Sequence, residues 1–594
     1  IVAGSAITTT TTNSAVLFSS TVSSAANVGN TASATNPLTV SAGSGNVTFT
    51  GAVGGATNGA LGALTVNTTG TTTFSSAVTA ASVTTNAGGA TAINGGTITT
   101  TGAQTYNDAV TLGVATTLNT SNSNIVFAST LNSSGSSRAL TIGAGTGSVT
   151  FTGAVGGSLA LGATNITAGT TTNSTTLVGS DAYAITGNAV VNGAISGVSN
   201  LSVSGTTTIA ANITTSGTQL YSGAVTLNTN TTLTTTDSNV TFASTVNSNT
   251  TPAKTLTIAA GSGTVAMNGA VGGSSVLGAT TITAGTFTSG SSGSIVMGAN
   301  ALILNVDAIN IGAAISGSTT LTIAPRTTST TIALGTSATG SLKLEDAELA
   351  YLTNGFSSIT FGSSTATGKI TAAAFNYSDY IKLYNYGASS SGIEFIGAFN
   401  TGTDNLTIYT TGSVTQAAGG SIAAAGLELL GTGASYALTN TANAISTLAG
   451  NTTTVSYLQN SNYVIGTVNT VGLTATTLTL SSTQTVTQSQ KIAVTGLELL
   501  GSGTFTLTNT GSANAVTTLA ANAGVVSFTQ STAYAVGTVN STVGLTTAGN
   551  LALVGSSGMT LGANVSSGVG TQTYTGPITL STGAITIAST DAAI

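Results

Sequence analysis

The 594-residue sequence has no histidine, cysteine or tryptophan, and only 3% of its residues are charged. Without histidine, the commonest general base and metal ligand is missing, so Ser-His-Asp catalysis is excluded. Without cysteine, thiol nucleophiles, disulfides and thiolate metal sites are excluded as well. We therefore expect a protein that is not an enzyme and that carries no cofactor and no metal ion.

Charge and long hydrophobic runs are equally scarce. The net charge of −6 is spread along the chain, and no run of Lys or Arg exists to follow a phosphate backbone, so nucleic acid is not an expected partner. Apolar residues alternate with Thr and Ser and never reach the 18 or more positions of a membrane helix. Disordered chains are usually rich in charge and poor in β-branched residues, the reverse of this composition, so we expect a folded chain.

A short glycine-bounded stretch occurs three times, as GSGNVTFTGAVGG (43–55), GTGSVTFTGAVGG (145–157) and GSGTVAMNGAVGG (261–273). Strand periodicity places one set of its residues on a buried face: Val47, Phe49, Val149, Phe151, Val265 and Met267. The flanking glycines suit sharp corners. Short strands, corners and repetition together predict a β-solenoid.

Other motifs recur with this stretch over residues 1–340, at a spacing of about 102 to 116 residues. The first is NSAVLFSSTVSS (13–24), SNIVFASTLNSS (123–134) and SNVTFASTVNSN (238–249). The second, QTYNDAVTL (104–112) and QLYSGAVTL (219–227), returns as QTYTGPITL (572–580) near the end of the chain. Coils of roughly 18 to 24 residues would give about 30 coils, each rising about 4.8 Å. We predict an all-β, elongated parallel β-helix.

Residues 341–410 interrupt this pattern. LKLEDAELAYL (341–351) predicts a single helical turn or a decorated loop. We interpret the carboxylates of this segment as solvated loop charges: Glu345, Asp346, Glu348, Asp379, Glu394 and Asp404. Residues 411–594 then follow a different solenoid repeat of about 71 residues, GLELLGTGASYALTNT (426–441) and GLELLGSGTFTLTNT (496–510). Glu428 and Glu498 are equivalent in it, which indicates a repeated turn or ladder role.

Four of the fourteen tyrosines gather in FNYSDYIKLYNYG (375–387). If Ile381 and Leu383 point inward, alternation places a candidate contact surface outside: Tyr380, Lys382, Tyr384 and Tyr386. Tyrosine suits stacking on sugar rings and contacts with partner chains. The alternative is that these rings fold back over a loop or an irregular coil.

The QTYNDAVTL, VTFTGAVGG and LELLGTGASYALTNT motifs, together with LEDAELAYLTNGFSSITFGSS (344–364), resemble the repeats of filamentous-haemagglutinin-like large exoproteins and β-strand-repeat adhesins of Gram-negative bacteria. The resemblance implies a right-handed parallel β-helix that is exported to the bacterial outer surface as an adhesin or filament.

Two functions follow as expectations. The first is a non-catalytic extracellular adhesin or stalk that contacts a glycan or a surface protein of another cell or matrix. The second is a structural subunit whose copies pack into a fibre, sheath or surface layer. A polysaccharide-cleaving β-helix enzyme and an ice-binding protein are further alternatives, because paired carboxylates and a threonine run at 8–12 are present.

Overall fold

The structure is a computed structural model that describes residues 1–594 except 25–34, 55–58, 180, 250, 388–391, 582 and 591–594. Strands make up 56% of it and helix 1%, and the parallel strands stack as a β-solenoid of about 26 turns. The predicted fold class is confirmed, with slightly fewer turns than expected. Gly55, the last residue of the first glycine-bounded copy, lies outside the described residues.

The chain forms two compact units, residues 1–297 (unit 1) and 298–594 (unit 2). The boundaries at about 340 and 410 follow from sequence repeats, and they stay a prediction. Each unit is described by itself below.

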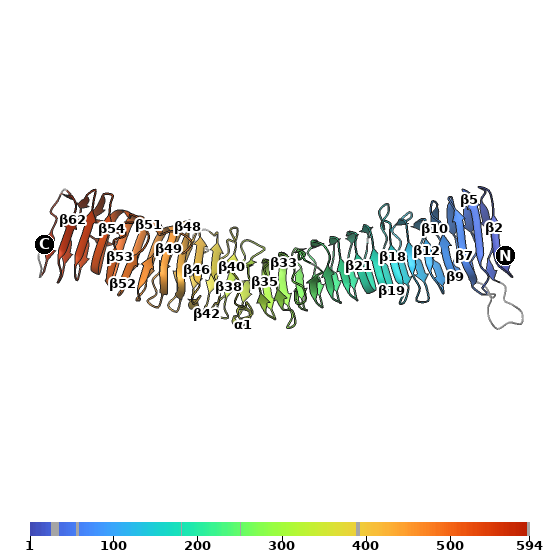
Figure 1. Ribbon diagram of the computed structural model, residues 1–594, viewed down its shortest axis with the longest axis horizontal. Helices are drawn as coiled ribbons and strands as arrows, with labels where there is room; N and C mark the ends of the chain where they lie inside the picture. The colour runs from blue at the N-terminus through green and yellow to red at the C-terminus, as the bar shows by residue number, and fades with distance from the viewer. Residues whose placement is uncertain are drawn as a thin grey trace. The chain divides into compact units, whose positions relative to one another are not determined.

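Three parallel ladders run through unit 1. In one coil, β21 (Tyr183–Val191) pairs with both β23 (Leu201–Val203) and β24 (Thr207–Ile209), while β22 (Ile195–Val198) pairs with β25 (Ile213–Thr215). Paired residues lie between 17 positions apart, as for Val198 and Thr215, and 31 apart, as for Val16 and Val47. Figure 1 shows these strands as successive rungs within the unit.

The recurring motifs of unit 1 turn out to be consecutive coils whose aromatic rings lie on one another. Phe127 of β15 (Ile125–Phe127) stacks on Tyr106 of β12 (Gln104–Tyr106) at 5.2 Å and on Phe151 of β18 (Ser148–Phe151) at 5.3 Å between ring centroids. The same positions form two more ladders: Phe18, Phe49 and Phe74, and then Tyr221, Phe242 and Met267. The six residues predicted to point inward are all 1% exposed or less, as expected.

Corners of unit 1 explain the glycine that opens each glycine-bounded strand. Asn122 has a φ of 59° and Gly145, in the next coil, a φ of 58°. The Asn122 side-chain oxygen accepts the Thr146 N–H at 3.0 Å, and a Cβ at residue 145 would collide with that oxygen. Glycine is required there by both the backbone conformation and the space.

Unit 2 contains longer strands. β48 (Ser421–Leu438) pairs with β49 (Ala444–Leu458), and β53 (Ile492–Leu507) pairs in the same way with β54 (Ala515–Gln530). Both pairs change register at a glycine, after Gly431 and after Gly501. The equivalent register shifts reflect the predicted repeat of about 71 residues.

The short helix predicted near residue 345 is present as α1 (Asp346–Leu349). Glu345 and Glu348 cap its first turn reciprocally, each side chain accepting a peptide N–H of the other residue. Figure 1 shows α1 at the margin of the stacked strands of unit 2. Beside it run β40 (Ser358–Gly362), β43 (Ile381–Asn385) and β46 (Asn405–Thr410), which pair in that order.

Candidate functional site

Strand β43 places the predicted contact residues on its outer side. Ile381 and Leu383 are completely buried in the solenoid, while Lys382 and Tyr384 alternate with them on the opposite face. Tyr380 and Tyr384 are half-buried, and Tyr386 is 45% exposed. The alternation expected from the sequence is therefore present, whereas a role in binding stays a prediction.

A fourth tyrosine, Tyr409, completes this surface. It faces outward on β46 and pairs in register with Tyr384 of the preceding coil. The Tyr409 ring stacks on Tyr384 at 5.5 Å with 14° between the planes, and on Tyr386 at 5.6 Å with 18°. We call Tyr384, Tyr386 and Tyr409 the tyrosine row. Tyr409 was not predicted from the sequence, although its alternation with the buried Leu406 and Ile408 was a usable signal.

Tyr380 lies on the same face but is engaged by the protein itself. Its hydroxyl lies 2.6 Å from the Thr407 hydroxyl and accepts a hydrogen bond from the Asn469 amide at 2.6 Å. The Lys382 ammonium lies 4.9 Å from the centre of the Tyr380 ring, a cation–π distance. Burial raises the pKa of Tyr380, partly offset by the Thr407 and Asn469 hydrogen bonds. Tyr380 therefore anchors one end of the surface rather than standing free.

Next to Tyr380, a buried carboxylate holds the loop 466–472 against the face of unit 2. Glu428 is 2% exposed and pairs in register with Thr407. Its two oxygens accept hydrogen bonds from the Thr407 hydroxyl at 2.6 Å, the Asn469 amide at 2.9 Å, and the Thr470 N–H and hydroxyl at 2.7 Å each. A carboxylate fully supplied with donors is stable in a buried position.

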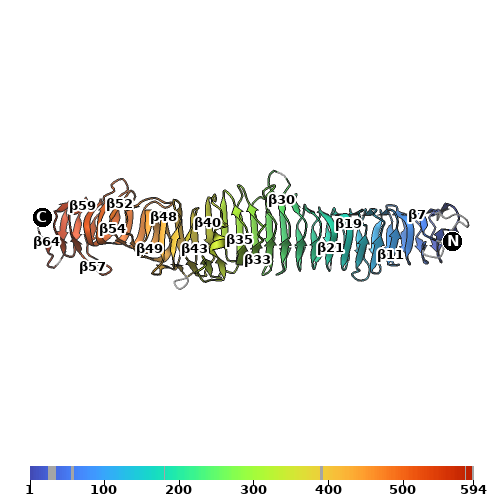
Figure 2. The ribbon, with the colours of Figure 1, turned by 90° about the horizontal axis from the view of Figure 1, so that it is seen from below.

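Glu498 repeats this arrangement about 70 residues later. It accepts hydrogen bonds from the Thr479 hydroxyl at 2.7 Å and from the Asn540 amide and Thr542 hydroxyl at 2.6 Å each. The loop it holds forms a small antiparallel hairpin of β56 (Thr538–Val539) and β57 (Thr542–Val543), visible beside the stacked strands in Figure 2. The repeated structural role expected for the two glutamates matches this geometry.

The pKa values of both glutamates lie below the usual range for a glutamate side chain. Burial opposes the charge of Glu428, but the hydrogen bonds from Thr407, Asn469 and Thr470 outweigh it and hold its pKa below the usual range. Burial acts against Glu498 in the same way, and donors from Thr542, Thr479 and Asn540 lower its pKa. Such carboxylates are poor general acids, because an acid catalyst needs a raised pKa.

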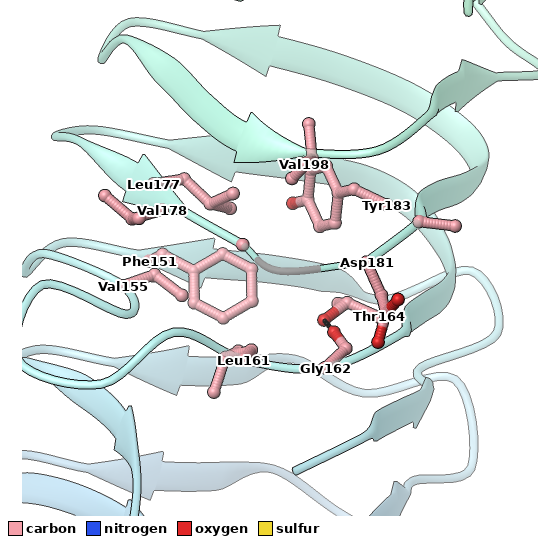
Figure 3. Close-up of a pocket in the computed structure, with 12 residues that line it drawn as sticks. Phe151, Val155, Leu161, Gly162, Thr164, Leu177, Val178, Asp181, Tyr183 and Val198 are labelled. Carbon is pink, nitrogen blue, oxygen red and sulfur yellow. Dashed lines mark hydrogen bonds between the residues drawn. The ribbon is translucent and has the colours of Figure 1, made fainter. Parts of the chain in front are cut away.

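One pocket between coils of unit 1 is too small for a ligand. Figure 3 shows this pocket between coils, where Phe151, Leu161, Leu177 and Tyr183 point toward one another. Its volume is about 10 Å³, which is roughly the space of one water molecule. The Tyr183 hydroxyl is satisfied by the Asn173 side chain at 3.2 Å. This pocket is a packing defect in a core, not a binding site.

The expectation that the carboxylates of residues 341–410 are solvated was wrong for one of them. Glu345 and Glu394 pair at the surface with Lys343 at 2.8 Å and Lys369 at 2.6 Å. Asp379, in contrast, is only 4% exposed. It lies in the turn before β43, where the solenoid and the segment around α1 enclose it, and sequence alone does not distinguish an enclosed turn from a solvated one.

Within the described ranges, no group of three or more His, Cys, Asp or Glu side chains lies together as a metal site would require. In the same part of the chain, no helix has the length and apolar character needed to cross a membrane.

The fold and this surface define a parallel β-solenoid with an outward tyrosine row. No family model, no curated protein and no solved structure matches the chain.

Proposed function

We propose that this chain is a non-catalytic β-solenoid of an extracellular adhesin or stalk at the bacterial outer surface. Its partner is a glycan or a surface protein of another cell or matrix. The observation that carries this proposal is the tyrosine row, three stacked rings presented on strands whose opposite face is buried. The repeat style shared with filamentous-haemagglutinin-like exoproteins supports the same assignment.

The tyrosine row has the properties of a contact surface. Each ring offers flat apolar area with a hydroxyl at its edge, which suits the apolar face and hydroxyl rim of a sugar ring. The rings of Tyr384 and Tyr409 are fixed by paired strands, so binding loses little side-chain entropy. Lys382 adds a positive charge beside the row, which favours acidic sugars or an acidic protein surface.

The test is the double variant Tyr384→Ala/Tyr386→Ala, compared with Tyr351→Ala. Tyr351 serves as the control because it is 38% exposed in unit 2 but is not part of the row. We expect the double variant to lose at least tenfold in binding to glycan arrays or cells while its circular dichroism stays unchanged. The Tyr351→Ala variant should bind like the wild type.

The same experiment separates the adhesin from a subunit of a fibre, sheath or surface layer. If the row packs copies side by side, the wild type will assemble with rising concentration and the double variant will not, as seen by light scattering and electron microscopy. A folded double variant with unchanged binding and unchanged assembly would contradict any contact role for the row.

A further inference from the structure

The tyrosine row brings phenol rings from two consecutive coils together on the surface of unit 2. The Tyr409 ring lies 5.5 Å from the Tyr384 ring and 5.6 Å from the Tyr386 ring, measured between centroids, with planes 14° and 18° from parallel. Tyr384 and Tyr409 pair in register on parallel strands, so their side chains leave the same face of the solenoid. Tyr386, which follows the last residue of β43, is 45% exposed. The row therefore combines contact between phenol rings with access to a reagent in solution.

This combination is absent from the other pair of tyrosines whose rings meet within the described residues. Tyr457 and Tyr463 lie 5.4 Å apart, but they are 0% and 2% exposed and their planes are 79° apart. Tyr351 is 38% exposed, and none of the ring contacts in that part of the chain joins it to another tyrosine. Contact alone and access alone each occur elsewhere in unit 2, and the row has both.

We propose that the tyrosine row is a site of oxidative cross-linking, at which Tyr409 becomes joined to one of its two stacked neighbours as dityrosine. The oxidant is hydrogen peroxide acting through a haem peroxidase. Each of two phenols loses one electron and its hydroxyl proton, and the two radicals form a bond between ring carbons next to their oxygens. The hydrogen on each of these carbons then moves to the phenol oxygen. The two electrons and two protons convert the peroxide into two water molecules.

Strand pairing supplies the proximity that the coupling needs. Tyrosyl radicals on separate molecules must meet by diffusion, whereas Tyr384 and Tyr409 are held together by the register of β43 and β46. Holding two reacting groups side by side converts a bimolecular step into an intramolecular one. The rings need to turn about their side-chain bonds to bring the two carbons together, and the exposure of Tyr386 leaves room for such a turn. The favoured product is therefore a bond within one chain.

A dityrosine bond ties together two coils that are otherwise held by strand pairing and side-chain contacts. The chain has no cysteine, so a disulfide is not available for this purpose. Tyr409 lies 23 positions after Tyr386 and 25 after Tyr384, and joining such residues constrains the unfolded chain as a disulfide does. The inference does not rest on the proposed adhesin function, because coupling depends on the geometry of the rings. Loss of coupling and loss of glycan or cell binding are separate outcomes.

The first test treats the full chain, at low concentration and neutral pH, with a haem peroxidase and hydrogen peroxide. We expect dityrosine fluorescence in the protein that migrates as a monomer under denaturing conditions, together with an intact mass lower by two hydrogen atoms. Absence of dityrosine, or dityrosine confined to dimers and larger species, would overturn the inference.

Cleavage after glutamate shows whether Tyr409 is joined. Glu394 lies between Tyr386 and Tyr409 in the sequence, and Tyr409 is the single tyrosine of fragment 395–428. After the oxidised monomer is unfolded and digested with a glutamate-specific protease, this fragment should stay joined to fragment 349–394. Release of fragment 395–428 in the same yield as from untreated protein would contradict coupling at Tyr409.

A second cleavage, after Lys382, identifies the partner of Tyr409. It leaves fragment 383–394, whose two tyrosines are Tyr384 and Tyr386. We expect this fragment to be the one attached to Tyr409. Attachment of a fragment that ends at or before Lys382 would contradict the inference, because the tyrosines there lie outside the row.

The matched variants are Tyr409→Phe and Tyr351→Phe. Phenylalanine keeps the stacked ring but has no hydroxyl hydrogen to lose, so Tyr409→Phe should lower the dityrosine yield of the monomer at least tenfold while its circular dichroism stays unchanged. Tyr351→Phe alters an exposed tyrosine outside the row and should react like the wild type. A folded Tyr409→Phe protein with the wild-type yield would place the coupling elsewhere and overturn the inference.

Discussion

The coils of units 1 and 2 stack through the same kind of parallel strand pairing. The side chains that hydrogen-bond to the corners and loops differ between the two units. Unit 1 contains five charged residues, and amides hold several of its corners: the Asn124, Asn188 and Asn212 oxygens each accept a peptide N–H from the next coil at 2.9 Å. At one corner the Asp237 carboxylate accepts the Ser262 N–H at 2.7 Å in the same way. Unit 2 contains the other fifteen charged residues and uses two of them, Glu428 and Glu498, to hold loops against its surface. A neutral amide can thus accept the same corner hydrogen bond as a carboxylate, whereas two carboxylates hold distant loops on the solenoid of unit 2.

Asp108 sharpens this contrast because it is a buried carboxylate in unit 1. It is 1% exposed and accepts the Gly89 N–H at 2.8 Å and a longer hydrogen bond from the Thr91 hydroxyl at 3.4 Å. Burial outweighs these donors and raises the pKa of Asp108, whereas the donors of Glu428 lower its pKa. The coil around Asp108 and the loops held by Glu428 and Glu498 therefore respond to acid in opposite directions.

The largest effect is expected in the neutral core of unit 1. Phe151→Ala removes the end of a stacked aromatic ladder and should cost about 3–5 kcal/mol of local stability. Because solenoid contacts link neighbours only, hydrogen exchange should accelerate in the adjoining coils and stay unchanged in unit 2. Phe151→Met is the matched control, since Met267 fills the equivalent position, and it should cost less than about 1.5 kcal/mol. Uniform loss of protection along both units would refute this local picture.

The second effect concerns the loop fastening of unit 2. Glu428→Gln removes the charge and replaces one acceptor oxygen by an amide donor facing donors, which should weaken the loop 466–472 by about 1.5–3 kcal/mol. Hydrogen exchange of the loop measures this, and the equivalent change Glu498→Gln should affect 537–544 alone. If each substitution left its own loop as protected from hydrogen exchange as in the wild type, the carboxylates would not be what holds the loops in place.

A smaller effect is expected from acid, which should change the local stability around Asp108 and around the two glutamates in opposite directions. The pKa values of Glu428 and Glu498 are lower in the folded protein than the ordinary 4.5, so their stabilisation is full above about pH 4.5 and disappears as the pH falls through the lowered values. The pKa of Asp108 is raised in the folded protein, so its buried charge destabilises the coil at neutral pH. This destabilisation disappears as the pH falls toward the ordinary 3.8 of an aspartate and the carboxylate is protonated. Hydrogen exchange between pH 6 and 3, corrected for intrinsic rates, should show weakening loops in unit 2 and a steady or firmer coil around Asp108. The opposite pattern would contradict the assigned pKa directions.

The smallest effect is expected at a surface ion pair. Lys369 and Glu394 approach to 2.6 Å, but their side chains are 45% and 31% exposed. Solvent screens such pairs, so Lys369→Met should change stability by less than about 1 kcal/mol, and salt should reduce even that. Chemical denaturation at low and high salt measures it. A loss as large as that of Glu428→Gln would mean that exposed charge also holds unit 2 together.

The sequence predicted the architecture well because strand alternation and corner glycines are local signals. Phe49, Phe151 and Met267 are buried as alternation requires. The vertical neighbours were not predictable, since paired residues are 17 to 31 positions apart in unit 1 and a change of one residue in a loop shifts every partner. That is why the stacking of Tyr409 on Tyr384 was missed. The hydrogen bond between Glu428 and the distant loop was not predictable either, because no residue near Glu428 in the sequence indicates a partner 41 residues away.

That sequence separation also makes each glutamate sensitive to the winding of the chain between it and its loop. Between Glu428 and Asn469 lie β49 and β50 (Tyr463–Ile465), which pair with each other. A residue inserted or deleted in that segment would shift Asn469 and Thr470 relative to Glu428 and leave a buried carboxylate without its donors, which is costly. Each glutamate thus favours the one winding of the intervening chain that supplies its donors.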